Sequence, residues 1–237
     1  MAGKYAHKEM HRGTGTGSLL RDIILGSQDG LVNVLGIILA VATAIVDVKI
    51  VIIAGLAATF AESISMAAVA YTSTKASRDF YRSELEREKW EMNHWPDRER
   101  EEIRVIYKNK GFTGALLNAI VKRITSNKKM WLNVMMDEEL HLTESHDNPV
   151  KSAAIVGFSA IGGSIVPLIS FFFLPVREAI IASLILAIIV LFVTGYIKGK
   201  LTTKPLRSAV EMAIIGMAAA IVGYAIGAVL GVALYAT

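Results

Sequence analysis

The chain has 237 residues, of which 53% are hydrophobic and 19% are charged, with a formal net charge of +4 and no cysteine. Its positive mean hydropathy is typical of an integral membrane protein and excludes an ordinary soluble domain. The lack of cysteine excludes disulfides and thiolate metal sites, so a metal ion would need carboxylate, imidazole, thioether or backbone oxygen ligands.

Five segments are long and apolar enough to cross a bilayer whose hydrocarbon core is about 30 Å thick. The polar N-terminal segment 1–19 lacks the features of a cleavable signal peptide, so we expect the first span to stay in the protein. The sequence therefore predicts an all-α membrane protein with transmembrane helices 1 and 2 in residues 20–74 and helices 3 to 5 in residues 150–237. The predicted spans are 20–46, 49–74, 150–173, 176–197 and 207–235.

A polar segment, residues 75–149, separates the second span from the third and contains most of the acidic residues. Apolar residues recur in it at helical spacing, and Pro96 and the Asn109-Lys110-Gly111 turn break the pattern. The segment is thus predicted to be a folded helical domain inserted between helices 2 and 3. Its expected helices are 76–94, continuing from the second span, 97–109, 113–125 and 128–143.

The distribution of basic residues predicts the orientation, because cytosolic joints of membrane proteins are enriched in lysine and arginine. The joints between the first and second spans and between the third and fourth spans contain only Lys49 and Arg177 as basic residues. We therefore expect the N-terminus and residues 75–149 in the cytosol, the C-terminus outside, and no nucleic-acid partner for the basic residues. With no targeting segment, a prokaryotic cell membrane is preferred to a vacuolar one. The basic residues on the cytosolic side are Lys4, Lys8, Arg12, Arg21, Lys198, Lys200, Lys204 and Arg207.

Two carboxylates, Asp29 and Glu62, stand inside predicted spans. A charge near mid-bilayer costs about 3 kcal/mol on insertion scales, so such residues usually face the protein interior and mark an ion path. Met66 lies one helical turn after Glu62 on the same face. As an alternative to a role in ion transport, Asp29 could pair with Arg21 or cap a helix. Met66 could instead pack in the core of the helix bundle.

Small residues accompany these carboxylates on the first and fifth spans. Glycines at positions 26, 30 and 36 would let another backbone approach the first helix. Glycines at 223, 227 and 231 form a ridge that indicates helix packing or dimerisation.

The polar segment carries carboxylates at helical spacing, with Glu84, Glu88 and Glu91 at i, i+4 and i+7 and then Glu99 and Glu102 at i and i+3. This pattern predicts a metal site, because a divalent ion removes the repulsion between facing carboxylates. A solvated acidic face is the alternative, since arginines and lysines are interleaved. A membrane-anchored ferritin-like di-iron oxidase or iron store is another, based on the Glu-x-x-His pairs Glu91/His94 and Glu138/His141. Met135 and Glu139, one turn apart, and Met136 with a second thioether are the remaining candidate ligands of this pattern.

Several motifs, taken together and in their order along the chain, give the sequence a resemblance to the vacuolar iron transporter family over nearly its whole length. They are Arg21-Asp22, Asp29-Gly30, Ser65-Met66-Ala67, the acidic helices, Ile103 to Tyr107, Trp131, Met135-Met136, Glu138-Glu139-Leu140, Asn148-Pro149 and Val166-Pro167-Leu168.

The resemblance implies a homodimer of five-span subunits that is not an enzyme and exchanges Fe²⁺, and in related members Mn²⁺, for protons. It places Asp29 and Met66 on the ion path near the dimer interface. It makes residues 75–149 a cytosolic metal-binding domain. The ligands that it implies there are Glu88, Glu91, Glu99, Glu102, Met135, Met136 and Glu139. Two departures stand out: Val69 and Ala70 replace a glycine and a glutamate of the family, with Glu62 upstream instead, and His141 replaces a glycine.

Overall fold

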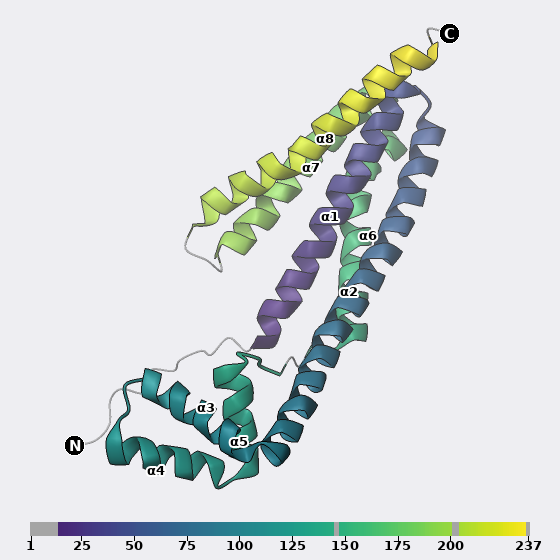
Figure 1. Ribbon diagram of the computed structural model, residues 1–237. Coiled ribbons are helices and arrows are strands. Elements are labelled where there is room, and N and C mark those ends of the chain that lie inside the picture. Colours follow the sequence, from purple (N-terminus) through teal and green to yellow (C-terminus); the bar gives the residue numbers. More distant parts are fainter. Residues whose placement is uncertain (1–13, 145–146, 201–203, 236–237) are drawn as a thin grey trace, which may run out of the picture. The chain divides into compact units, whose positions relative to one another are not determined.

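The computed structural model describes residues 14–144, 147–200 and 204–235, and every regular element within these residues is a helix. Figure 1 shows their arrangement. The elements are α1 (Thr14–Ala44), α2 (Val48–His94), α3 (Pro96–Asn109), α4 (Gly114–Thr125), α5 (Lys128–Val134), the π-helix η1 (Met135–Glu139), α6 (Pro149–Phe173), α7 (Val176–Lys200) and α8 (Pro205–Tyr235).

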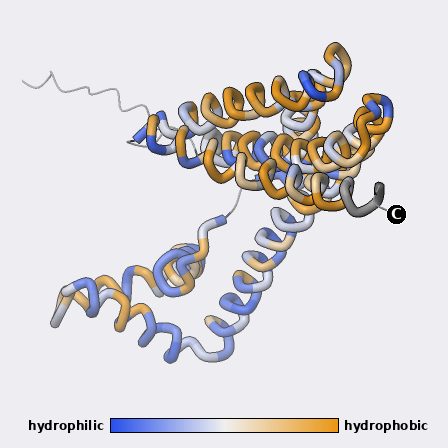
Figure 2. The backbone as a smooth tube through the Cα atoms, turned by 90° about the horizontal axis from the view of Figure 1, so that it is seen from above, coloured by the Kyte–Doolittle hydropathy of each residue, from blue (hydrophilic) through white to orange (hydrophobic). Residues whose placement is uncertain are grey.

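Five of these helices, α1, α2, α6, α7 and α8, are long and apolar enough to cross a membrane. Figure 2 shows hydrophobic residues prevailing along α1, α6, α7 and α8, and hydrophilic ones frequent in α3 to α5 and in the C-terminal part of α2. The predicted all-α class with five long apolar helices is therefore confirmed. Lys4, Lys8 and Arg12, used for the predicted orientation, and residues 201–203 of the basic link lie outside the described residues.

The main departure from the predicted helices concerns residues 128–143, which were expected to form one helix. The structure instead has α5, then the wider turn of η1, and regular structure ends at Glu139. His141 adopts a left-handed backbone conformation with φ of 53°, which a continuing right-handed helix does not allow. Elsewhere the ends differ by a few residues, and α2 is continuous with the segment that starts at 76, as predicted.

The chain divides into two compact units, one of residues 1–72 and 147–237 (unit 1) and one of residues 73–146 (unit 2). In unit 1, α1 packs mainly on α6 and α8, and α8 packs on α7. The buried face of α1 repeats at helical spacing, as expected of a helix with neighbours on several sides. Its fully buried residues are Leu31, Val34, Leu35, Ile38 and Leu39.

Glycines bring the backbones of unit 1 into contact, as the first-span glycines predicted. A methyl group on Gly30 would lie 2.7 Å from Ser164 Oγ and against the Ala160 carbonyl oxygen of α6. Gly223 and Gly227 of α8 meet the backbone of α1 at Gly36 and Ala40 in the same way. The α8 ridge, for which packing or dimerisation was open, therefore packs against α1 within the same chain.

Replacing Gly163 with alanine tests this packing. The new Cβ would lie 2.7 Å from the carbonyl carbon of Ser27, and neither atom sits on a flexible side chain that can move away. Overpacking of this kind costs about 1–3 kcal/mol, so we expect a lower midpoint in thermal unfolding of the detergent-purified protein. A methyl group on the adjacent Gly162 would have nothing within 4 Å of it, so Gly162→Ala should leave the midpoint unchanged. Equal midpoints for the two variants would contradict the close packing of α1 on α6.

Unit 2 has its own apolar core, formed where α3, α4, α5 and η1 meet the last turns of α2. Local signals define its helices: Pro96 occupies the first turn of α3, where a missing N–H is harmless. Asn127 caps α5 by accepting hydrogen bonds from the backbone N–H groups of Lys129 and Met130, both at 3.0 Å. The core residues are Met92, Ile103, Leu117, Val121, Ile124, Trp131 and Met135.

Candidate metal sites

The first candidate site lies between α1 and α2 in unit 1, where the carboxyl groups of Asp29 and Glu62 are within hydrogen-bond reach of one another. Asp29 stands in the middle of α1 and caps no helix. Arg21, its other predicted partner, pairs instead with Asp22 at 3.2 Å. Met66 follows Glu62 by one turn of α2 and is partly buried. The structure thus brings the two predicted intramembrane carboxylates together.

Sequence reasoning missed Asn33, which belongs to this site. Its side-chain Nδ2 donates a hydrogen bond of 3.1 Å to Oε1 of Glu62. Because Asn33 follows Asp29 by four residues, the two share a face of α1. That spacing was the available signal, since an amide in an otherwise apolar span needs a reason to be there.

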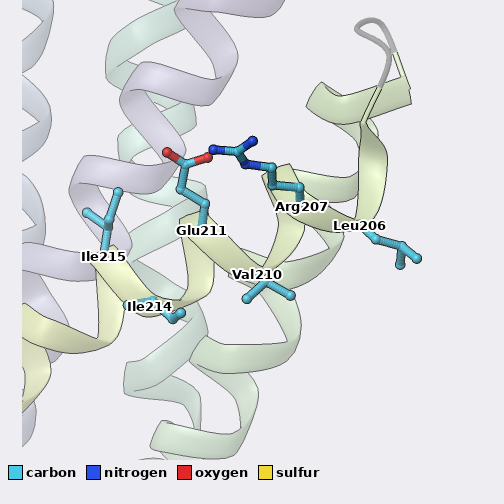
Figure 3. A pocket seen from close by; sticks show the side chains of 6 residues that line it. All are labelled: Leu206, Arg207, Val210, Glu211, Ile214 and Ile215. Carbon is cyan, nitrogen blue, oxygen red and sulfur yellow. The ribbon is translucent and has the colours of Figure 1, made fainter.

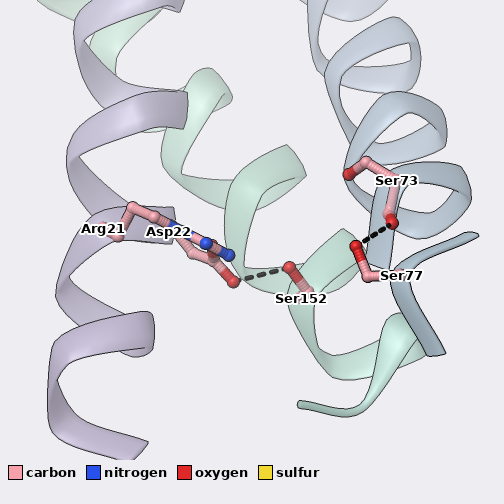
Figure 4. A network of polar contacts seen from close by, with 5 residues as sticks. All are labelled: Arg21, Asp22, Ser73, Ser77 and Ser152. Atoms are coloured by element: carbon pink, nitrogen blue, oxygen red, sulfur yellow. Dashed lines mark hydrogen bonds and ion pairs between the residues drawn. The ribbon is translucent and has the colours of Figure 1, made fainter. Parts of the chain in front are cut away.

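Hydrogen bonds to α6 hold both helices of this site in place. The buried carboxylate of Asp22 on α1 accepts a bond of 2.6 Å from the Ser152 hydroxyl (Figure 4). Ser63, next to Glu62 on α2, donates through Oγ to the Gly157 carbonyl oxygen at 2.9 Å. Each bond joins residues distant in sequence, and neither partner on α6 carried a signal that pointed to it.

The second candidate site lies in unit 2 and collects carboxylates from three elements. Oxygen atoms of Glu88 and Glu91 on α2 and of Glu99 on α3 all lie within 4.8 Å of one another. Oxygen atoms of Glu99, Glu102 and Glu139 do the same, the last from η1. Glu99 belongs to both triads, so the five carboxylates form one continuous cluster. It contains every glutamate ligand that the family resemblance implies for this unit, but not Glu84, which the spacing alone also offered.

Burial separates two members of this cluster from the other acids of unit 2. Glu88 and Glu99 are each only 1% exposed, and one oxygen of each, Oε1 and Oε2 respectively, lacks a hydrogen-bond partner. Buried carboxylates are normally paired or bound to a metal. Glu84, in contrast, pairs with Arg87 at 2.7 Å and Glu86 with Lys89 at 2.6 Å on the surface. The solvated-face alternative fits those two acids, and it also fits two members of the cluster: Glu102, which pairs with Arg98 at 3.3 Å, and the exposed Glu139. It does not fit the buried Glu88 and Glu99.

Burial and mutual repulsion raise the pKa of three carboxyl groups in the cluster. Burial raises the pKa of Glu99 to about 8, helped by the hydrogen bond with Glu88 and the charge of Glu102. The pKa of Glu139 rises to about 7, through burial and then the charges of Glu102 and Glu99. Burial also raises the pKa of Glu88. A divalent cation bound to the cluster would replace these protons and would favour the ionised carboxylates.

The π-helix η1 supplies the remaining candidate ligands. Met135 and Met136 are fully buried, and Met135 is part of the apolar core of unit 2. Single π-turns within α-helical structure are frequently found at functional sites, and here the turn carries Glu139 to Glu99 and Glu102. Glu138 pairs with Lys110, whose ammonium group lies 5.1 Å from the ring centre of Tyr107.

The di-iron alternative requires Glu91/His94 and Glu138/His141 to converge. His94 instead stacks on Trp90, with ring centres 4.2 Å apart, and its Nδ1 contacts the Trp90 carbonyl oxygen at 2.8 Å. His141 is exposed, and Glu138 is engaged by Lys110. Among the described residues, neither histidine belongs to a potential ligand group.

Comparison with known proteins gives the family of the chain. A family model described as the VIT family matches residues 20–228. The chain belongs to the VIT family. Curated relatives that match most of its length are named vacuolar iron transporters.

Three of these relatives are plant proteins. "Vacuolar iron transporter 1" of Tulipa gesneriana is 34% identical over 92% of this chain and 89% of its own length. The protein of the same name from Eucalyptus grandis is 35% identical over 89% and 85%. That from Arabidopsis thaliana is 32% identical over 94% and 90%. The resemblance found in the sequence motifs is therefore confirmed at the level of the family.

The surface of this VIT family chain also has a hollow of about 550 Å³ that contains none of the candidate ligands. It lies on the N-terminal half of α8, where Arg207 and Glu211 point toward one another above aliphatic side chains (Figure 3). An apolar surface with a charged end is ordinary for a helix that enters a membrane. The lining residues are Leu206, Arg207, Val210, Glu211, Ile214 and Ile215.

The raised pKa of Glu99 predicts how pH affects the stability of metal-free unit 2. The pKa rises from the ordinary 4.5 to about 8, so the folded state binds more protons in that interval than the unfolded state does. Stability is therefore full below about pH 4.5 as far as this group is concerned, and it is lost as pH rises toward 8. We expect the midpoint temperature of thermal unfolding to decrease as the pH is raised from about 5.5 to 8.

Tryptophan fluorescence of the whole detergent-purified protein measures this effect. All three tryptophans, Trp90, Trp95 and Trp131, lie in unit 2, so their emission reports its unfolding. Chelator should be present throughout. Glu99→Gln should flatten the dependence, because an amide does not titrate. A midpoint that rises with pH in the wild-type protein would contradict the raised pKa.

Proposed function

We propose that this chain is a transporter that moves Fe²⁺ across a membrane and out of the cytosol in exchange for protons, and that it also accepts Mn²⁺. The observation that carries the proposal is the contact between Asp29 and Glu62 within helices of membrane-spanning length. Its relatives are named as iron transporters and not as enzymes.

The chemistry of exchange follows from the carboxylate pair. Two carboxylates that face each other repel, and either a divalent cation or protons relieve this repulsion. The two occupants are mutually exclusive, because a protonated carboxyl group is a poor metal ligand. Asp29 and Glu62 supply hard oxygen ligands and Met66 supplies a softer thioether, a combination that suits Fe²⁺ and Mn²⁺ better than Mg²⁺ or Ca²⁺.

The carboxylate cluster of unit 2 serves in the proposal as the cytosolic collector of metal. Two buried carboxylates with unpartnered oxygens, Glu88 and Glu99, support a cation site, and Glu91, Glu102 and Glu139 complete it. Met135 and Met136 add thioether ligands from η1. Since basic residues such as Arg21 and Lys198 flank the spans, the positive-inside rule favours a cytosolic location for the N-terminus and for residues 75–149, the predicted metal-binding domain.

The family resemblance extends the proposal to assembly and location. We propose a homodimer in the lipid bilayer, with the site of Asp29 near the interface between the subunits. The relatives' names point to a vacuolar membrane, whereas the sequence alone favoured a prokaryotic cell membrane. In both settings the ion leaves the cytosol.

A transport assay on the purified protein in proteoliposomes tests the proposal. Uptake of Fe²⁺ and of Mn²⁺ is measured with and without an imposed pH gradient, while dissolved oxygen is followed. We expect uptake that depends on the gradient and consumes no oxygen beyond that in protein-free liposomes. Uptake indifferent to the gradient would overturn proton exchange. Protein-dependent oxygen consumption with Fe²⁺ and no uptake would overturn transport and support the di-iron oxidase.

A further inference from the structure

Asn33 occupies a position in the site of unit 1 that neither the sequence motifs nor the proposed function assigns. It follows Asp29 by four residues on α1, as Met66 follows Glu62 by four residues on α2. Residues four apart lie above one another on one helix face. With Asn33 bonded to Glu62 across the two helices, the two pairs form a four-residue set.

The orientation of the Asn33 amide follows from the chemistry of its partner. The carboxyl oxygen Oε1 of Glu62 is the acceptor in this contact, so the amide presents its NH₂ group to Glu62. The 3.1 Å bond from Nδ2 to Oε1 agrees with this. The amide oxygen then faces away from Glu62, and it accepts no hydrogen bond from the described residues. A carbonyl oxygen in that state is a ligand for a divalent cation.

The surroundings of Asn33 leave this oxygen accessible. Asn33 is exposed and lines an apolar groove of about 300 Å³ between α1 and α8. Among the described residues that line the groove, it is the only one with a polar side chain. An unpaired amide oxygen beside such a surface lacks the partners that polar groups normally find.

We propose that Asn33 is a fourth metal ligand of the transport site, which holds Glu62 in place through its NH₂ group and offers its amide oxygen to the ion. The inference rests on the proposed function and deepens it. Its physical sense lies in charge: Asp29 and Glu62 together neutralise a divalent cation, and a neutral third oxygen adds a ligand without adding charge. A third carboxylate would leave a net negative site within the membrane, which is costly when empty and retains the cation when full.

Three substitutions at this one position separate a ligand from a merely structural residue. Asn33→Ala removes both the oxygen and the support of Glu62, so we expect KM for Fe²⁺ uptake to rise about 10- to 100-fold, as for other residues that orient metal ligands. Asn33→Asp adds a charge at the same volume, so we expect a lower KM together with a lower maximal rate, because release slows. Asn33→Gln should recover part of the alanine defect.

The controls keep the outcome decisive. Ile37, one turn farther along α1, lines the same groove, so Ile37→Ala should leave KM unchanged and exclude an effect of groove shape. Changes of KM in opposite directions at one position cannot arise from poor folding, which lowers only the amount of active protein. If wild-type protein transports Fe²⁺ while the alanine and aspartate variants keep its KM or shift it in the same direction, the Asn33 assignment fails alone. If wild-type protein transports no metal, the proposed function fails, and this inference fails with it.

Discussion

Replacing Asp29 with alanine is expected to reduce Fe²⁺ uptake into proteoliposomes to the background of protein-free vesicles. The variant removes one of the two carboxylates that meet between α1 and α2. Glu62 alone neutralises half the charge of a divalent ion, and a partly neutralised ion is poorly held in a low-dielectric site. Asp29→Asn should behave alike, since it keeps the shape and loses the charge.

A second aspartate at the start of α2 provides the control. Asp47 is exposed and caps α2 by accepting a bond of 2.8 Å from the Lys49 backbone N–H. Asp47→Ala should cost about 1 kcal/mol of stability, as the loss of a cap does, and leave uptake in place. Transport retained by Asp29→Ala, in protein that elutes like wild type on size exclusion, would remove Asp29 from the ion path.

Replacing both Glu88 and Glu99 with glutamine is expected to have two effects of opposite sign. Metal binding by unit 2 should be lost, because Glu99 belongs to both carboxylate triads and Glu88 to one. The metal-free protein should become more stable near pH 8, because two buried carboxyl groups with raised pKa no longer ionise there. A residue retained only for stability would give the reverse of the second effect.

Tryptophan-monitored unfolding of the whole protein, with and without added Mn²⁺, measures both effects at once. Wild-type protein should show a metal-dependent rise in its midpoint, since an ion that binds only the folded state stabilises it. The variant should show no rise and a higher starting midpoint. Glu86 and Glu101 form exposed ion pairs with Lys89 and Arg104 and provide the control. The double variant Glu86→Gln, Glu101→Gln should change the free energy of unfolding by less than about 0.5 kcal/mol. A metal-dependent rise retained by the site variant would show that these acids are not ligands.

The five long helices were predictable because their signal is local: length and apolar composition are read directly from the chain. The failure at 128–143 has an equally physical cause. A π-turn differs from an α-turn by one residue per hydrogen-bonded ring, and the spacing of apolar residues around Met135 fits both. The left-handed conformation of His141 was not predicted, although the resemblance placed a glycine at this position, and glycine is the residue that this conformation favours.

The candidate sites were predictable to the extent that their residues share a helix. Spacing along α2 placed Glu84, Glu88 and Glu91 on one face, yet only tertiary packing decides that Glu84 meets Arg87 at the surface while Glu88 is buried. The central place of Glu99 likewise depends on how α3 folds back on α2 after Pro96. Asn33 escaped notice because its partner Glu62 is 29 residues away on another helix.

The burial of Met135 and Met136 has a consequence for oxidative damage. Ferrous iron and peroxide generate hydroxyl radicals, and methionine is converted by oxidants to a polar sulfoxide that disrupts apolar packing. Their burial shields both thioethers from oxidants in solution, whereas Met130, 37% exposed, is open to them. Met135, Met136 and Glu139 share η1, so an oxidant formed by iron held at the carboxylate cluster would arise on the same short helix as these thioethers. Oxidation of Met130 first therefore indicates an oxidant from the solvent. Oxidation of Met135 and Met136 first indicates an oxidant formed by iron at the carboxylate cluster.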